Sequence, residues 1–470
     1  MPDTKFDDQA TARYQGVERR QQSRSAPSKR MMRMSSYIGL LLADVTVLAL
    51  SPVIGLTLLK LVGLPRGEEV ASFALIPIYV VLCFNAGGYS LDVLIRRAES
   101  IRRSASAFLM ALMLTLFCAA MLKNAEDISR LAFAAGAATA FILLITERFI
   151  YFRLINWVSG GKMVDQLLIL DGKPLRSPHD GSVVLDARRA QLRPDLNDPA
   201  MLDRFGRLAA AVDRIVVDCT ADTRRAWALM LKGADVDGEI MLSEANVTGA
   251  IGMRVFNGHD TLLVSRKPLS LSDRAKKRAL DLALTVPLII AFSPLLVMIA
   301  VLIKLDSTGP VLFRQARVGR GNQQFKVLKF RSMRVERSDA TGGTSASRDD
   351  DRITRVGRII RKTSIDELPQ LLNVLLGDMS LVGPRPHALG SLAGERLFWQ
   401  VEETYWHRHQ LKPGITGLAQ VRGFRGATLE ISDLTNRLQA DMEYIADWDI
   451  WRDITILFNT VRVVVHRNAF

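Results

Sequence analysis

Cysteine is scarce in this chain of 470 residues. The three cysteines, Cys83, Cys118 and Cys219, are too few and too scattered for a disulfide framework or a thiolate zinc site. Negative charge is also in short supply, because 62 Lys and Arg face 48 Asp and Glu, a net charge of +14. A hydrophobic content of 49% excludes a disordered chain. The excess of positive charge therefore favours anionic lipid or a phosphorylated substrate as its partner.

Residues 160–266 lack tyrosine and lack a Gly-x-Gly-x-x-Gly turn. Short β-rich runs alternate there with polar helical stretches, which predicts a small, mostly parallel, Rossmann-like α/β domain over residues 160–266. Its first strand leads into Asp171-Gly-Lys-Pro174, so the close backbone approach to a pyrophosphate is missing. Without tyrosine, a Tyr/Lys hydride-transfer pair cannot form. We therefore expect this domain to have a structural role and not to bind a nucleotide. The expected strands are 166–170, 182–185, 214–217, 238–242 and 261–264.

Long apolar runs fill the first third of the chain and argue against a soluble nucleic-acid binder, so no nucleic-acid partner is expected. Residues 1–34 are polar and rich in arginine, which predicts a disordered basic tail. Four apolar runs then each approach the ~20 residues that a spanning helix needs, which predicts a four-helix transmembrane domain over residues 35–150. These runs are 35–59, 71–90, 104–122 and 131–146.

The positive charges between the runs predict the orientation of this domain. Basic residues cluster in the tail, in the loop between the second and third runs, and after the fourth run, where Arg148, Arg153 and Lys162 stand. Lys and Arg favour the cytoplasmic side, so both ends of the four-helix unit are predicted to face the cytoplasm. Asp44 lies within the first run, where it has either a functional role or a polar partner in the bundle.

A fifth apolar run, residues 282–303, has basic residues on both flanks and is interrupted by Pro287, Ser293 and Pro294. A spanning helix would place the strongly basic segment after Lys304 outside, against the positive-inside rule. Proline kinks a helix, and Ser293 can bond back to a carbonyl and reinforce the bend. We therefore predict a re-entrant membrane helix over residues 279–304, at the start of a domain that covers residues 272–470.

The residues after this run are typical of a diphosphate site. Arg and Lys supply the donors that phosphate oxygens need, and the Gly383-Pro-Arg-Pro386 turn places Arg385 on a stiff backbone. Ser364 and Glu367 have the spacing of a capping box before an apolar helix. A carboxylate in a first helical turn is kept ionised, as a covalent phosphoryl nucleophile at Asp366 must be. Adjacent carboxylates beside many cations also suit one Mg²⁺ ion.

Several motifs in a fixed order now make the chain resemble a known family. Residues from Lys277 onward are similar to the bacterial sugar transferases, monotopic polyprenyl-phosphate hexose-1-phosphate transferases with a re-entrant helix. The whole chain resembles the large members, which place four membrane helices and a Rossmann-like domain ahead of a mainly α-helical transferase. The matching motifs are Ser293-Pro294, Lys329-Phe-Arg-Ser-Met333, Asp351-Arg-Ile-Thr354, Asp366-Glu-Leu-Pro-Gln370, Gly383-Pro-Arg-Pro386 and Pro413-Gly-Ile-Thr-Gly417.

The resemblance implies transfer of a sugar-1-phosphate from a UDP-sugar to undecaprenyl phosphate, with release of UMP, at the bacterial inner membrane. It implies Asp366 as the nucleophile and Glu367 as the ligand of a Mg²⁺ cofactor. The residues that it implies for phosphate binding are Lys329, Arg331 and Arg385, with Arg317 and Arg352 as helpers. The donor is expected to be UDP-glucose or UDP-galactose, for exopolysaccharide or capsule synthesis. The resemblance allows a homodimer, although the sequence has no heptad or other pairing signal.

Two other function classes remain as alternatives. A membrane nucleotide-sugar dehydratase would need the glycine fingerprint and a Tyr/Lys pair, and a non-catalytic scaffold would not need Asp366, Glu367 and Arg385. The C-terminal stretch 448–465 mixes aromatic residues with an apolar helical face, so it either packs on the domain core or lies among lipid headgroups. His407 and His409 have no other metal-ligating residue at a suitable spacing, so a metal role is not expected.

Overall fold

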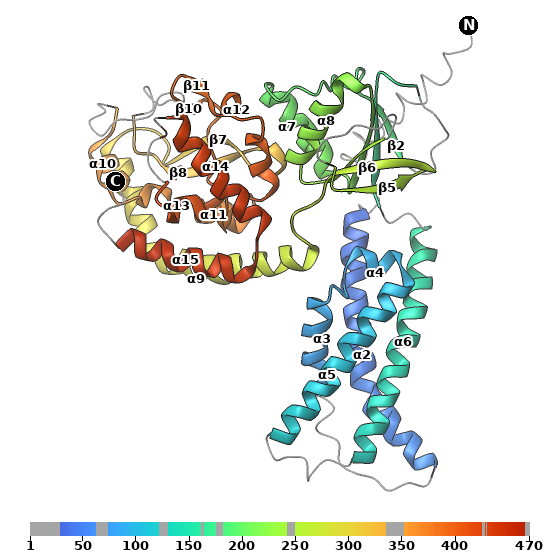
Figure 1. Ribbon diagram of the computed structural model, residues 1–470. Coiled ribbons are helices and arrows are strands. Elements are labelled where there is room, and N and C mark those ends of the chain that lie inside the picture. Colours follow the sequence, from blue (N-terminus) through green and yellow to red (C-terminus); the bar gives the residue numbers. More distant parts are fainter. Residues whose placement is uncertain are drawn as a thin grey trace. The chain divides into compact units, whose positions relative to one another are not determined.

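The computed structural model describes residues 29–62, 74–121, 130–160, 164–174, 182–241, 250–334, 352–424, 428 and 430–465 (Figure 1). The described chain is mostly helical, with one mixed sheet and three two-stranded sheets. Its contacts divide it into two compact units, one within Gln15–Val164 and one that contains Asp165–Phe470. By length and composition, four of the described helices could cross a membrane.

The first unit contains the helices of the predicted transmembrane domain, residues 35–150. Its first helix begins at Lys29, so the end of the predicted tail is helical, while residues 1–28 lie outside the described part. The helix in the second apolar run has 11 residues, or ~16 Å, and is too short by itself to cross a bilayer. The other three are among the four spanning candidates, and the fourth is α9, in the second unit. The helices are α2 (Lys29–Leu61), α3 (Leu75–Asn85), α4 (Leu91–Ile95), α5 (Arg97–Met121) and α6 (Arg130–Ser159).

Asp44 is fully buried and has a polar partner inside this unit. Arg148 donates to its Oδ2 over 2.5 Å, and the hydroxyls of Tyr79 and Tyr89 donate to the same oxygen over 3.2 and 2.8 Å. The interpretation of Arg148 as part of a cytoplasmic basic flank was wrong, because it lies within α6 and is 1% exposed. Of the two alternatives for Asp44, the structure shows the paired one. A charge among apolar helices is costly unless an opposite charge and hydrogen bonds accompany it.

The second unit begins with an α/β domain around one six-stranded sheet in the order β2-β1-β3-β4-β6-β5. The first four strands are parallel, whereas β6 is antiparallel to both β4 and β5. The sheet is therefore mixed, and the sequence reading missed its edge strand β5. The elements are β1 (Gln166–Asp171), β2 (Val183–Asp186), α7 (Pro199–Ala210), β3 (Arg214–Cys219), α8 (Ala221–Gly233), β4 (Asp237–Met241), β5 (Gly252–Phe256) and β6 (His259–Ser265).

A hairpin turn in the sequence could have revealed β5. Asn257 and Gly258 connect β5 to β6, and both have positive φ angles, 48° and 80°. An Asn-Gly pair is the favoured two-residue hairpin connection because both positions tolerate this backbone conformation. The strand itself is largely exposed and lacks the apolar run by which the other strands were recognised.

The remaining part of the second unit, residues 271–465, has one long helix, an antiparallel hairpin and many short elements. The β7–β8 hairpin was not expected in a mainly helical domain, and it pairs Leu312–Val318 with Gln324–Phe330. The elements are α9 (Leu271–Asp306), β7, η2 (Arg320–Asn322), β8, α10 (Arg355–Lys362), η4 (Ile365–Glu367), α11 (Gln370–Leu376), β9 (Ser380–Val382), β10 (Leu392–Ala393), β11 (Arg396–Leu397), α12 (Phe398–Val401), η5 (Tyr405–Gln410), β12 (Gly414–Thr416), α13 (Leu418–Val421), α14 (Ile431–Ala446) and α15 (Ile450–Val465).

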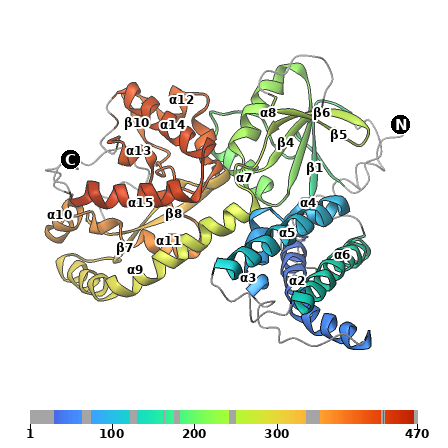
Figure 2. The ribbon, with the colours of Figure 1, turned by 60° about the horizontal axis from the view of Figure 1, so that its bottom comes forward.

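Helix α9 covers the fifth apolar run and runs along one edge of this domain beside α15 (Figures 1 and 2). Ser270 caps its start by accepting a hydrogen bond from the Asp273 backbone. Ser293 donates to the carbonyl of Ile290 over 2.7 Å, which confirms the predicted back-bond before Pro294. Two prolines inside one helix each remove a backbone hydrogen bond, which favours a bend in α9.

Both ends of α9 contact the same domain. Near its start, Arg278 donates to the carbonyls of Val374 and Leu375. Near its end, Asp306 accepts from the backbone of Val356, and Ile303 packs with Phe330 and Ile360. Between these ends the helix exposes apolar side chains, with Ile290 67% and Val297 64% exposed.

Helix α15 packs on the domain core through one face only. Asp453 pairs with Lys277 of α9 over 2.6 Å, and Ile456 is buried in the core. Trp451 and Phe458 on its other face are each 73% exposed. The prediction that this stretch packs on the core is confirmed, and its contact with headgroups stays a prediction.

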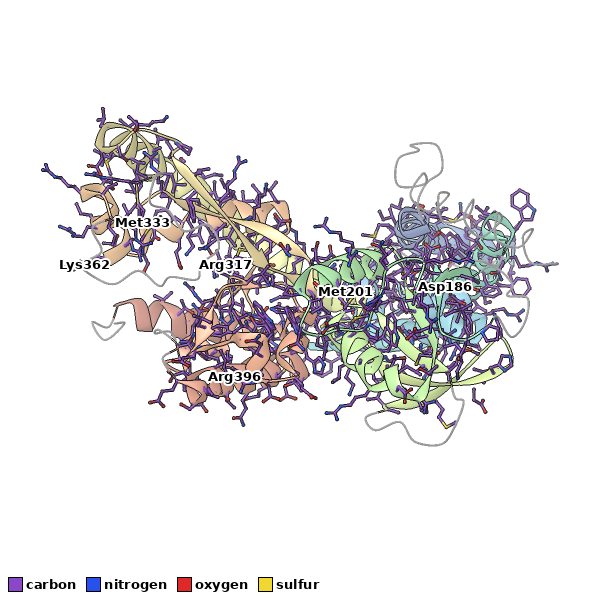
Figure 3. All side chains as sticks on the ribbon, turned by 90° about the horizontal axis from the view of Figure 1, so that it is seen from above. Asp186, Met201, Arg317, Met333, Lys362 and Arg396 are labelled. Atoms are coloured by element: carbon purple, nitrogen blue, oxygen red, sulfur yellow. The ribbon has the colours of Figure 1, made fainter. Side chains whose placement is uncertain are left out.

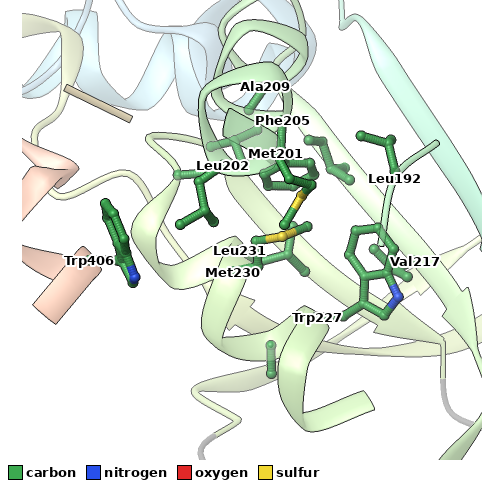
Figure 4. Packing of buried hydrophobic residues seen from close by; sticks show 14 of the residues in the cluster. Leu192, Met201, Leu202, Phe205, Ala209, Val217, Trp227, Met230, Leu231 and Trp406 are labelled. Atoms are coloured by element: carbon green, nitrogen blue, oxygen red, sulfur yellow. The ribbon is translucent and has the colours of Figure 1, made fainter. Parts of the chain in front are cut away.

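One apolar core joins the α/β domain to the rest of the second unit. Trp406 from η5 is 1% exposed, and its cluster includes Leu202 of α7 and Leu231 of α8 (Figure 4). Gly206 allows close contact here, because a Cβ atom at this position would lie 2.1 Å from the carbonyl oxygen of Gly321. The two parts therefore share a packed interface.

Candidate active site

The two adjacent carboxylates stand on the short 3-10 helix η4, between α10 and α11. Ser364 precedes η4 with a positive φ of 54°, and its carbonyl accepts from the Glu367 backbone over 3.2 Å. The predicted capping box is wrong, because the Ser364 side chain makes no capping bond and α11 begins only at Gln370, after Pro369. The left-handed backbone conformation of Ser364 forms a tight turn directly before Asp366 and Glu367.

Glu367 is held by two cations from different parts of the chain. Its Oε1 accepts from Lys329 over 2.9 Å and from Arg385 over 2.7 Å. Burial alone would raise the pKa of Glu367, but the charges of Arg385 and Lys329 outweigh it and hold this pKa well below the usual range. Glu367 is therefore ionised at any physiological pH.

Asp366 lies in a different electrostatic environment. Burial is the largest influence and, with the charge of Glu367, raises the pKa of Asp366 to about 6, although Lys329, Arg361 and Arg385 oppose the shift. The expectation of a helix terminus that favours ionisation does not hold, since η4 has only three residues. Arg361 was not singled out as a site residue, because only the fold brings α10 beside η4.

Arg385 owes its position to two motifs that pair with each other. Strand β9 is parallel to β12, and the backbone of Gly383 donates to the Thr416 carbonyl over 2.8 Å. A Cβ at Gly383 would lie 2.4 Å from the Lys412 carbonyl oxygen, so this close approach requires glycine. The Gly-Pro-Arg-Pro and Pro-Gly-Ile-Thr-Gly motifs thus form one rigid support for Arg385.

Arg317 lies near this cluster on β7. Its guanidinium donates to the side chain of Gln315 and to the carbonyl of Pro386, next to Arg385. Burial and the charge of Arg385 lower the pKa of Arg317 to about 10. In the view of Figure 3, Arg317 lies between Met333 and Met201 of α7. The structure therefore brings together Asp366, Glu367, Lys329, Arg385 and Arg317.

One predicted phosphate-binding residue, Arg331, contacts the end of α9, and the role predicted for Arg352 stays a prediction. Arg331 is 4% exposed and donates to the carbonyls of Ser307 and Thr308 at the end of α9, over 2.7 and 2.6 Å. Its role in these contacts is to fix α9 to the hairpin. The carbonyl of Arg352 accepts from the backbone of Arg334, in the segment before α10. Among the described contacts, Arg331 has no hydrogen bond to Asp366 or Glu367.

The carboxylate pair could supply few of the ligands that a metal ion needs. The described residues contain no cluster of three or more metal-ligating side chains. Glu367 Oε1 already accepts from two cations, whereas the shortest described contact of Oε2 is 3.4 Å, to Arg385. Oε2 is therefore the atom that could take a Mg²⁺ ion, whose remaining ligands would be substrate phosphate oxygens and water.

The histidines of η5 are used in packing. His407 contacts the carbonyl of Leu229 over 3.3 Å, and His409 contacts the side chain of Asn322 over 2.8 Å. Burial lowers the pKa of His407 to about 4, so this ring is neutral at pH 7.

The raised pKa of Asp366 predicts the acidic limit of any reaction that needs its carboxylate. We expect kcat/KM to fall about tenfold per pH unit below pH 6, because the protonated acid cannot attack. Arg361→Gln removes a charge that favours ionisation, so it should move this limit to higher pH. Lys362→Gln changes an exposed neighbour and should leave the limit in place. A pH–rate profile that is flat from pH 5 to pH 8 would contradict the assignment.

A carboxylate pair set among Lys and Arg is the class of site that binds and acts on phosphorylated substrates. The family model for "Bacterial sugar transferase" matches residues 272–467. An exopolysaccharide production protein of Rhizobium leguminosarum is 47% identical over 40% of this chain and 94% of its own length. The chain belongs to the bacterial sugar transferase family.

Two further relatives have names that state an activity. An undecaprenyl-phosphate glucose phosphotransferase of Komagataeibacter xylinus is 51% identical over 46% of this chain and 41% of its own length. A UDP-glucose:undecaprenyl-phosphate glucose-1-phosphate transferase of Caulobacter vibrioides is 51% identical over 40% of this chain and 68% of its own length. The match thus spans less than half of the Komagataeibacter protein.

Proposed function

We propose that this protein transfers hexose-1-phosphate from a UDP-sugar to undecaprenyl phosphate and releases UMP. The observation that carries the proposal is a pair of carboxylates in different environments. The pKa of Asp366 is raised to about 6, whereas Glu367 forms ion pairs with Lys329 and Arg385. The names of the Komagataeibacter and Caulobacter relatives support glucose as the sugar. The product is the lipid-linked sugar from which an exopolysaccharide or capsule starts.

In the first half-reaction, Asp366 acts as the nucleophile. One of its carboxylate oxygens forms a bond to the sugar-bearing phosphorus, and the bond from this phosphorus to the UMP oxygen breaks. UMP leaves with the electron pair, and a phosphosugar-aspartyl enzyme remains. Lys329, Arg385 and Arg317 bind the phosphate oxygens and stabilise the charge that develops on them.

In the second half-reaction, a phosphate oxygen of undecaprenyl phosphate attacks the same phosphorus. The bond to Asp366 breaks and its carboxylate is restored, so the enzyme returns to its starting state. Arg385 and Lys329 serve both half-reactions, because the phosphorus stays within reach of the same carboxylate throughout.

The proposal includes a Mg²⁺ ion that would have Glu367 as a ligand. When bound, it supplies positive charge to the diphosphate and favours departure of UMP. Glu367 keeps its full negative charge for this purpose because Arg385 and Lys329 hold its pKa low.

We also propose that α9 is re-entrant and that residues 271–465 face the cytoplasm at the bacterial inner membrane. The contacts of Arg278 and of Asp306 with the same domain support this, because a helix that crossed the bilayer would separate them. Its exposed middle, with Ile290 and Val297, suits the hydrocarbon of one leaflet. UDP-sugar and the lipid phosphate would then meet at η4 on one side of the membrane.

Release of UMP is the direct test of the activity. Purified full-length protein in lipid nanodiscs with undecaprenyl phosphate and Mg²⁺ is expected to release UMP from UDP-glucose. A parallel set with UDP-galactose and N-acetylated UDP-hexoses identifies the donor. If none of these donors yields UMP in excess of a lipid-free control, the proposed function is wrong.

Labelling of engineered cysteines tests the membrane placement of α9. The starting variant lacks Cys83, Cys118 and Cys219, and single cysteines then replace Lys276 or Lys304, one at each end of the helix. In oriented inner-membrane vesicles, an impermeant maleimide should label both positions from the cytoplasmic side. Labelling of the two positions from opposite sides would show that α9 crosses the bilayer.

A further inference from the structure

The segment η5 (Tyr405–Gln410) lies between the α/β domain and the loop that carries Arg385, and the proposed reaction uses neither the segment nor the domain. On one side, side chains of η5 form hydrogen bonds to backbone carbonyls of the α/β domain. These bonds position the segment. These hydrogen bonds run from Trp406 Nε1 to Leu196 (2.9 Å), from His407 Nε2 to Leu229 (3.3 Å) and from Gln410 Nε2 to Lys232 (2.6 Å).

The other face of η5 presents Arg408 to the candidate active site. Arg408 is 2% exposed, and its guanidinium donates to the carbonyl of Arg385 over 2.9 Å and to Nδ1 of His387 over 2.6 Å. Asp441 of α14 accepts from Arg408 Nε and Nη2 over 2.9 and 2.6 Å. One guanidinium thus binds the residues on both sides of Pro386.

The contact with Arg385 has a consequence for the candidate site. Arg385 is fixed at its backbone by Arg408 and at its side chain by Glu367. The prolines on both sides of Arg385 leave its backbone little freedom, so a shift of its carbonyl also moves the guanidinium. A buried ion pair such as Arg408–Asp441 contributes little net stability by itself, because desolvation offsets the attraction. The hydrogen bonds from Arg408 to Arg385 and His387 are therefore more important for the position of the Arg385 loop than for stability.

We propose that Arg408 is a positioning residue, and that through η5 the packing of the α/β domain sets the position of the Arg385 guanidinium beside Glu367. The α/β domain then has a mechanical role in the proposed reaction. The inference rests on the proposed function for its turnover measurements, although not for its titration measurement.

Arg408→Lys tests the positioning role, because lysine keeps the charge but cannot form the forked set of hydrogen bonds. We expect kcat to fall about 10²-fold, as misplacement of a binding group by ~1 Å can do. The acidic limit should move above pH 6, because a displaced Arg385 no longer favours ionised Asp366. The charged groups that influence Asp366 most are Lys329, Glu367, Arg361 and Arg385, so the shift reports on Arg385 and not on Arg408 directly.

Asp441→Asn provides a second variant that keeps the size of the side chain. It leaves Arg408 without its counter-ion, and we expect a shift of the acidic limit in the same direction. Thermal unfolding of each variant separates loss of position from loss of folded protein. Wild-type turnover with an unchanged acidic limit in folded Arg408→Lys overturns the proposal, and so does lost turnover with an unchanged limit in the fraction that remains folded.

Gln410→Ala tests the link to the α/β domain, because it removes a hydrogen bond to Lys232 without touching the candidate site. We expect a smaller fall in kcat than in Arg408→Lys, and the acidic limit should again move to higher pH. Arg225→Gln is the matched control, since Arg225 and Glu403 form an exposed ion pair that joins α8 to the segment before η5. It should leave both quantities unchanged. An unchanged Gln410→Ala enzyme would show that the domain does not set the position of Arg385.

A titration without turnover separates this inference from the proposed function. In full-length, Mg²⁺-free protein with ¹³C-labelled aspartate, the carboxyl signal of Asp366 should titrate at a higher pH in Arg408→Lys than in the wild type. If the wild type releases no UMP but this shift occurs, only the proposed function fails. If the wild type is active and the signal does not move, only the positioning role fails.

Discussion

Asp366→Asn is expected to lower UMP release by about 10³-fold or more. The substitution keeps the size of the side chain but removes the anionic oxygen that attacks the phosphorus, and no second route to the intermediate is then open. Rapid-quench measurement of UMP from UDP-glucose, with and without undecaprenyl phosphate, should show neither a burst nor steady turnover. In the wild type, a burst without the lipid acceptor should equal the concentration of enzyme, because the first half-reaction needs only the donor.

Asp378→Asn is the matched control for this prediction. Asp378 is exposed and lies after α11, outside the cation cluster, so the same chemical change there should leave turnover unaffected. A labelled phosphosugar that remains attached to the Asp366→Asn protein would contradict covalent catalysis at this residue. Asp366→Asn turnover at the wild-type rate would contradict it equally.

Glu367→Gln is expected to lower kcat by about 10²-fold, the usual cost of losing one electrostatic contact in an active site. Lys329 and Arg385 lose the carboxylate that holds them, and the position proposed for Mg²⁺ loses its anionic ligand. The acidic limit should at the same time move below pH 6, because Glu367 is a like charge that raises the pKa of Asp366. Steady-state rates from pH 4.5 to pH 8, at several concentrations of Mg²⁺, measure both effects.

The direction of this pH shift distinguishes Glu367→Gln from a general loss of structure. Arg361→Gln should move the limit upward and Glu367→Gln downward, although both variants lower activity. Glu403→Gln removes an exposed carboxylate near η5 and should leave the profile unchanged. If both site variants shift the limit in the same direction, the electrostatic assignment of Asp366 is wrong.

Local sequence patterns were sufficient to predict the long apolar helices and five of the six strands in the larger sheet. They failed where a feature depends on a distant partner. Strand β5 is largely exposed and forms because β6 pairs with it through the turn at Asn257 and Gly258. Arg148 looked like part of a cytoplasmic flank because its partner, Asp44, is 104 residues away in the sequence.

The candidate site shows the same division. Lys329 and Arg331 belong to one motif, yet Lys329 binds Glu367 while Arg331 binds the end of α9. β8 ends at Phe330, between the two residues, and their different partners come from segments far away in the sequence. No spacing rule separates their roles, because the partners are brought close only by packing.

The chemistry that is available can be predicted from the sequence alone. Two adjacent carboxylates, a stiff arginine turn and an apolar helix with two prolines are all local properties of neighbouring residues. The fold, in contrast, sets which cations surround each carboxylate and how strongly burial raises the pKa of Asp366. It also decided that η5 joins the α/β domain to Arg385. Charge interactions and burial depend on distance in space, and the fold sets these distances between residues far apart along the chain.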